Sequence, residues 1–152
     1  MTEQEMPIIF QRKQTRKIDA EVLSDKVSAA LADLTESYIV QVKQDIQVMQ
    51  DLLKQAETAS PQKKFNLIRE DFFVKMHDLK GQGTTFGYPL LTEIGAVVCD
   101  FLRERKSFSL LDISYLKQYV DDAAVIVQKN LTGDGGKAAA VIRKRLDEAK
   151  NA

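Results

Sequence analysis

The fold is decided by residues 60–87, SPQKKFNLIREDFFVKMHDLKGQGTTFG. Ser60 is a good helix cap, and Pro61 suits the first position of a helix. Apolar residues then recur at steps of three and four, the period of a helix with one buried face. Gly87 is the expected left-handed stop. The stretch therefore predicts one amphipathic helix whose buried stripe is Phe65, Ile68, Phe72, Met76 and Leu79.

The same helical period precedes this stretch. Asp19 can cap a helix there, and no Gly or Pro decides whether that helix breaks near Leu34-Thr35 or runs straight on. Residues up to Lys17 are expected to form a tail. The expected stripe of this segment is Leu31, Leu34, Tyr38, Val42, Ile46, Met49, Leu53 and Ala56.

Three more helices are expected after residue 87. One starts at about Pro89, one follows the cap Ser109, and a short last one covers residues 138–150 after the glycine-rich break at 132–136. The break lacks the Lys-Ser/Thr pair of a phosphate-binding loop and is expected to be a linker. The expected stripes are Leu90, Leu91, Ile94, Val97, Val98, Phe101 and Leu102, then Ile113, Leu116, Val120, Ala123 and Val127.

These elements predict an all-α protein. Short links between long amphipathic helices favour an antiparallel up-down-up-down four-helix bundle, with an extra peripheral helix at each terminus. The expected organisation is an N-terminal tail (1–17), a bundle with its preceding helix (18–132), and a linker with a C-terminal helix (133–152). The pairs Lys63-Lys64 and Asp121-Asp122 are expected on the solvated surface.

Composition excludes several function classes. The 152 residues include 22 Lys plus Arg and 22 Asp plus Glu, so the net charge is zero. A neutral chain lacks the basic surface that nucleic acids and anionic membranes attract, so neither is expected as a partner. No apolar run approaches the roughly 20 residues of a membrane span, and no signal peptide is recognisable at the start. A single Cys99 cannot form an internal disulfide, which favours a cytoplasmic location.

The candidate functional residue is His77, the only histidine. At about 100° per residue it lies roughly 140° from the centre of its helix's apolar stripe, so it should be exposed. Phe73, Lys80, Gly81 and Thr84 share its face. A glycine inside a helix costs about 1 kcal/mol relative to alanine, so Gly81 and Gly83 need a reason. Gly81 would let another protein approach the ring, whereas Gly83 should point inward at a close helix contact.

This pattern suits a histidine that carries a phosphoryl group. A neutral imidazole has a nitrogen lone pair that can attack phosphorus. Lys80 supplies a compact positive charge one turn away to offset the phosphate. Phosphoryl transfer otherwise depends on positioning and a metal ion. The sequence offers no metal site, so a partner would have to bring the metal.

The sequence resembles a histidine-containing phosphotransfer (HPt) domain, and also the phosphorylated N-terminal domain of chemotaxis histidine kinases. The matching residues are His77, Leu79, Lys80, Gly81, Thr85, Phe86 and Gly87, followed by Leu90, Leu91 and Ile94. The resemblance implies a phosphorelay intermediate without kinase activity. His77 would accept a phosphoryl group on its outer nitrogen and exchange it with an aspartate of a receiver domain in a response regulator or hybrid kinase.

The resemblance also implies roles for neighbouring residues. Lys80 would stabilise the phosphate, and Gly81, Thr84, Phe73 and Tyr88 would border the receiver contact. The receiver would supply magnesium, and the chain itself would need no cofactor and act as a monomer. The family often places Glu or Gln on the third helix to hydrogen-bond the inner ring nitrogen. This chain has Cys99 there, a poor hydrogen-bond partner, with Asp100 beside it.

Three other readings compete with a phosphocarrier. His77-Asp78 resembles the dipeptide of metal-dependent phosphohydrolases, but those enzymes need several histidines. A histidine-kinase dimerisation domain has a similar box, which normally continues to a proline, whereas Gly81-Gln82 follows here. A helical interaction module that has lost phosphotransfer is the third reading, and the departure at Cys99 is compatible with it.

Overall fold

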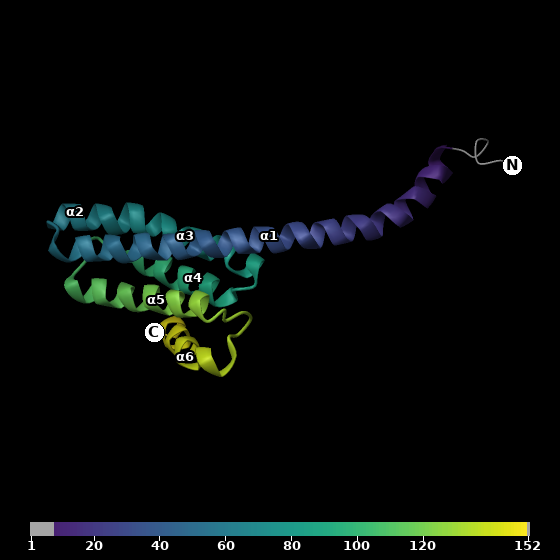
Figure 1. The fold of residues 1–152 in the computed structure, drawn as a ribbon. Helices are drawn as coiled ribbons and strands as arrows, with labels where there is room; N and C mark the ends of the chain where they lie inside the picture. Colours follow the sequence, from purple (N-terminus) through teal and green to yellow (C-terminus); the bar gives the residue numbers. More distant parts are fainter. Residues whose placement is uncertain (1–7, 152) are drawn as a thin grey trace. The chain divides into compact units, whose positions relative to one another are not determined.

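The computed structural model describes the backbone of residues 8–151 and the side chains of residues 21–151. In that range all regular structure is helical and no strand occurs, which confirms the all-α prediction. The α-helices are α1 (Ile8–Thr58), α2 (Pro61–Asn66), α3 (Phe73–Gln82), α4 (Pro89–Glu104), α5 (Leu110–Gln128) and α6 (Ala140–Lys150), and Figure 1 shows their course. The π-helical stretch η2 (Leu67–Phe72) joins α2 to α3, and short 3-10 turns, η3 (Thr84–Phe86) and η4 (Gly136–Ala139), follow α3 and precede α6.

The N-terminal region differs from the prediction. Residues 1–7 of the expected tail lie outside the described residues, but α1 begins at Ile8, so a tail reaching Lys17 is wrong. There is also no separate N-terminal helix, because α1 passes Leu34-Thr35 without a break. The Thr35 hydroxyl donates to the Leu31 carbonyl at 2.8 Å, a bond that a threonine makes inside a continuous helix.

The chain divides into two compact units, Met1–Tyr38 and Ile39–Ala152, and the division falls inside α1. In the first unit five large apolar side chains are half exposed or more, at 50–60% for Val22, Leu23, Val27, Leu31 and Leu34, whereas Tyr38, its last residue, is 6% exposed as the stripe predicted. Leu31 and Leu34 were expected in the core, and that expectation is wrong. A stripe with the correct period is therefore not sufficient for burial.

The second unit contains most of the core. The predicted stripes are buried there with few exceptions: Val42, Ile46, Met49, Leu53 and Ala56; Ile68, Phe72, Met76 and Leu79; Leu90, Leu91, Ile94, Val98 and Leu102; Ile113, Leu116, Val120, Ala123 and Val127. Within this unit α3 packs along α4, and α4 also contacts α5 and α6. An ion pair of 3.0 Å between Lys75 and the largely buried Asp45 ties α3 to the last part of α1.

The helix ends follow the sequence signals. The Ser60 side chain accepts a hydrogen bond from the Lys63 amide at 3.4 Å, and Pro61 is the first residue of α2. Gly87 stops the turn after α3 with φ +90°, in the left-handed region that glycine favours. Ser109 caps α5 in a reciprocal capping box with Asp112. These signals placed the start of α2, the stop after α3 and the start of α5.

The last helix packs within the second unit through charge as well as apolar contacts. Arg145 of α6 pairs with Asp122 of α5 at 3.0 Å, and the Gln118 amide also donates to that carboxylate at 3.2 Å. Asp122 is only 5% exposed, so the expectation of a surface residue is wrong. Burial raises the pKa of Asp122, while Arg145 opposes the rise. Arg145 of α6 thus neutralises the buried carboxylate of Asp122 on α5.

Candidate functional site

His77 lies on α3 with its side chain exposed, as its angular position predicted. The opposite face of the helix is anchored by Met76 and Leu79, both buried. The described side chains make no hydrogen bond to the His77 ring. The ring nitrogens are therefore accessible to an approaching molecule, while the opposite face of the helix is packed in the core.

An aromatic and cationic cluster surrounds the base of this histidine. The Phe73 ring stacks on the His77 ring, with 6.1 Å between centroids and 28° between planes. Two guanidiniums lie over the Phe73 ring, from Arg69 at 5.8 Å and from Arg103 of α4 at 5.5 Å. The helical period predicted Phe73 on this face, but neither arginine was predicted here. The four-residue steps 69, 73 and 77 could have signalled Arg69, whereas Arg103 comes from another helix.

Lys80 lies at a close approach of α3 and α4. A Cβ added to Gly95 of α4 would lie 2.5 Å from the Lys80 backbone nitrogen and 2.8 Å from its Cα. The backbones are thus in direct contact at this point, which only glycine permits. Among the described residues, no carboxylate forms an ion pair with Lys80, whose side chain is half-buried. Its charge is therefore available one turn from His77. Gly95 was not predicted as a site residue.

The two glycines of α3 have different surroundings, as the sequence predicted. A Cβ on Gly81 would meet no atom within 4 Å, so the surface beside His77 is open there. A Cβ on Gly83 would lie 2.7 Å from both the Thr92 hydroxyl and the Tyr88 carbonyl. Gly83 therefore serves helix packing, and Gly81 leaves space on the surface.

Thr84 and Tyr88 were expected to border a docking surface, and the structure separates them. Thr84 is exposed, and its amide and hydroxyl both bond to the Thr92 hydroxyl, at 2.8 and 2.9 Å. Tyr88 is only 2% exposed, and its hydroxyl donates to the Asn130 side chain. A buried tyrosine cannot contact a docked protein, so the expectation for Tyr88 is wrong. Its ring instead fastens the turn after α3 to the end of α5.

The residues expected to orient the His77 ring do not reach it. The Cys99 thiol is fully buried and makes no hydrogen bond to His77. Asp100 is exposed and pairs with Arg103 at 3.5 Å instead. The ring-orienting role proposed for these two residues is therefore wrong, because one points into the core and the other along its own helix. The stacked Phe73 ring is the side chain that contacts the imidazole.

The burial of Cys99 predicts an unreactive thiol. Burial raises the pKa of Cys99, and the nearby charges of Arg103 and Lys80 only partly oppose the rise. Because the thiolate is the reactive form, we expect a disulfide reagent at pH 8 to react about 100-fold slower or more with the folded chain than with the chain in urea. Absorbance of the released thiol measures both rates. Equal rates would contradict a buried Cys99.

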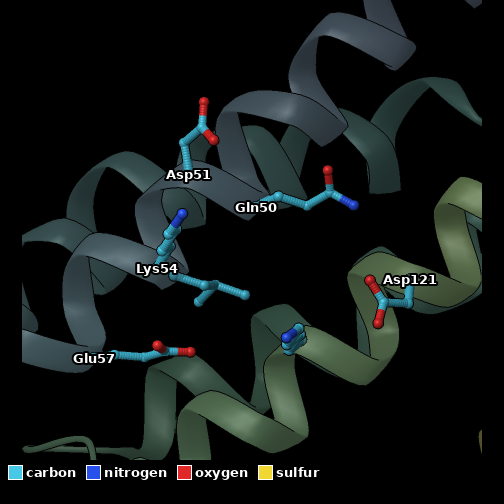
Figure 2. Close-up of a pocket in the computed structure, with 7 residues that line it drawn as sticks. Gln50, Asp51, Lys54, Glu57 and Asp121 are labelled. Carbon is cyan, nitrogen blue, oxygen red and sulfur yellow. The ribbon is translucent and has the colours of Figure 1, made fainter.

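One cavity lies away from His77, between the last part of α1 and α5. It has a volume of about 380 Å³, and its polar lining includes Lys117 of α5. Figure 2 labels four more of its lining residues, Gln50, Lys54 and Glu57 of α1 and Asp121 of α5. Both carboxylates and lysines line it, but neither histidine nor cysteine does. In the described part of the chain, no group of three or more His, Cys, Asp or Glu side chains is placed to hold a metal ion.

Comparison of the chain with protein-family models, curated proteins and solved structures found no match. The resemblance to phosphotransfer domains therefore depends on the residues around His77 alone. Among residues 8–151, no helix is both long enough and apolar enough to cross a membrane.

Proposed function

We propose that this protein is a phosphocarrier of the HPt type, in which His77 accepts a phosphoryl group and exchanges it with the aspartate of a receiver domain. The observation that supports the proposal is the exposed His77 ring on a helix fixed in the core, with Lys80 one turn away and open space at Gly81. The proposal includes a four-helix bundle built from the last part of α1, the α2–α3 segment, α4 and α5. It also includes a cytoplasmic, monomeric protein without kinase activity of its own.

The proposed transfer balances without a further reactant. The lone pair of the outer nitrogen, Nε2, attacks the phosphorus of the receiver's aspartyl phosphate. The N–P bond forms as the P–O bond to the aspartate breaks, and the electron pair stays on the aspartate carboxylate. The imidazole keeps the proton on Nδ1 and becomes a phosphoimidazolium. Lys80 offsets the negative charge of the phosphoryl group on this side, and the receiver's magnesium ion offsets it on the other.

A second candidate function is a helical interaction module of the same fold without phosphotransfer. The observation that favours it is the missing hydrogen bond to the His77 ring, since phosphotransfer needs a defined ring orientation. The two candidates differ in one measurable property, namely whether the chain takes up a phosphoryl group.

The test is transfer from phosphorylated receiver domains to the purified chain. We expect at most one phosphoryl group per chain, released by mild acid as expected for an N–P bond, and mapped by mass spectrometry to the peptide that contains His77. Receivers with the phosphorylated aspartate replaced by asparagine are the control. Uptake from no receiver in a broad panel, or label on a serine, threonine or aspartate of this chain, would overturn the proposal.

The open surface at Gly81 makes a separate prediction. Gly81→Gln should leave the unfolding temperature unchanged or raise it, because the side chain meets open space and a helical glycine is replaced. Transfer from the receiver should slow by about tenfold or more, since the new side chain lies where the partner must approach. The matched control is Gly81→Ala, which adds one carbon and should transfer at nearly the wild-type rate. Equal rates for the two variants and the wild type would refute the clearance role.

A further inference from the structure

The orientation of the His77 ring is unexplained by hydrogen bonding. A histidine that receives a phosphoryl group in line must present one nitrogen in a narrow range of directions. The side chain has a free torsion about the bond to its ring, and the terminal torsion of histidine is broad. Since the described side chains give the ring no hydrogen bond, something else must restrict that torsion.

The Phe73 ring provides this restriction. It lies one helical turn before His77, and the two planes are 28° from parallel at a centroid distance of 6.1 Å. Aromatic rings favour offset stacking at about 4.5–7 Å between centroids, so this pair is within the attractive range. Rotating the imidazole out of the stack would lose that contact. Phe73 is half-buried, so it can itself be held by the core.

Two arginines hold Phe73 in turn. The Arg69 and Arg103 guanidiniums lie 5.8 and 5.5 Å from the Phe73 centroid, within the range of cation–π attraction. Arg69 also donates to the backbone carbonyl of Leu102 at the end of α4, and Arg103 forms an exposed ion pair with Asp100 at 3.5 Å. The Phe73 ring therefore has cationic neighbours from two elements, η2 and α4.

The backbone before Phe73 supports this arrangement. The stretch η2 is a π-helix that ends at Phe72, directly before α3 begins. A π-helical turn is wider than an α-helical one, so it rotates the residues before Phe73 relative to those after it. Such turns are rare and occur frequently at functional sites. Here the wide turn includes Arg69, one of the two arginines that contact the ring.

We infer that Phe73, held by Arg69 and Arg103, is the positioning residue of His77, in place of the hydrogen-bonding residue on the third helix. The stack fixes the imidazole plane so that Nε2 faces the approaching phosphoryl group. This inference rests on the proposed phosphocarrier function. In this inference the stack on Phe73 sets the orientation of the His77 ring, which Cys99 and Asp100 do not reach.

The test uses the fact that the chain has one histidine, so its imidazole signals in an NMR spectrum belong to His77 alone. Three variants are compared with the wild type. Phe73→Leu removes the ring, and Phe73→Tyr keeps a ring that can stack. Phe65→Leu is the matched control, because Phe65 is also half-buried and stacks on Phe108 at 5.9 Å and 29°. Unfolding temperatures show whether each variant is folded.

In Phe73→Leu we expect the His77 ring-proton shifts to move towards the values of an unstacked imidazole, with no such movement in Phe65→Leu. Receiver-dependent phosphorylation should lose about 10- to 100-fold in kcat with little change in KM, because misplacement affects the transfer step rather than docking. Phe73→Tyr should restore both the shifts and kcat. Arg103→Gln should move the shifts in the same direction, whereas Arg105→Gln, whose guanidinium lies over Phe101 at 4.5 Å, should not.

Each other outcome overturns the positioning role in a distinguishable way. Unchanged ring shifts in Phe73→Leu would show that the rings do not stack in solution. Moved shifts with unchanged kcat would show that the stack does not serve transfer, and a rise in KM alone would make Phe73 a docking residue. If the wild type itself accepts no phosphoryl group, the proposed function fails first, and the NMR result still reports whether the rings stack.

Discussion

Gly95→Ala is expected to destabilise the protein, although alanine is normally the better helix former. The added carbon would lie 2.5–2.8 Å from backbone and Cβ atoms of Lys80, closer than any real contact. Backbone cannot rotate away as a side chain can, so α3 and α4 must separate. Overpacking of this kind costs about 1–3 kcal/mol, more than the roughly 1 kcal/mol that alanine gains in helix propensity. We expect a net loss of about 1–2 kcal/mol in the free energy of unfolding by urea.

The matched control for Gly95→Ala is the same substitution at Gly81. It also lies inside a helix, but its new carbon meets open space, so the gain in helix propensity is not opposed. Gly81→Ala should therefore raise the free energy of unfolding by about 0.5–1 kcal/mol. If both variants were stabilised, the close approach of α3 and α4 at Lys80 would be wrong. Because Lys80 and His77 share α3, loss of this contact should also disturb the candidate site.

Most of the helices could be predicted from local signals in the sequence. The cap at Ser60, the capping box at Ser109 and the left-handed Gly87 each act within a few residues, so the sequence states them directly. The apolar stripes of the second unit were also predictable, because burial of one helix face repeats at a fixed period. The exposure of His77 followed from the same period.

The failures concern relations between elements. The stripe at Leu31 and Leu34 has the correct period, yet burial also needs a partner surface, which periodicity does not reveal. Asp122 was expected on the surface, because the sequence does not show that it pairs with Arg145, which lies 23 residues away on another helix. The π-helical stretch before Phe73 has no Gly or Pro to mark it. A regular helix was therefore assumed where the structure has a π-helix.

In the candidate site, too, features within one helix were predicted and contacts between helices were not. Residues on α3 were placed correctly because they share one helix face, and this holds for Phe73, Lys80 and Gly81. Contributions from α4 were missed or wrong, since the sequence does not give the register between two helices. Gly95 and Arg103 reach the site, whereas Cys99, expected beside the ring, is buried. The contact of Gly95 with the Lys80 backbone, which is part of that register, is seen only in the structure.

His77→Ala is expected to abolish phosphoryl transfer while leaving the fold intact. The side chain is exposed and contacts the Phe73 ring, so its removal should change the free energy of unfolding by no more than about 1 kcal/mol. Transfer should fall below detection, because the chain contains no second histidine that could take over. The measurement is label uptake from a phosphorylated receiver, with circular dichroism and thermal unfolding as the control for folding. A folded variant that is still labelled at the wild-type rate would place the acceptor elsewhere. A variant that fails to fold would contradict the exposed position of His77. In that case His77→Gln, which keeps a polar side chain of similar length, would separate loss of the nucleophile from loss of the fold.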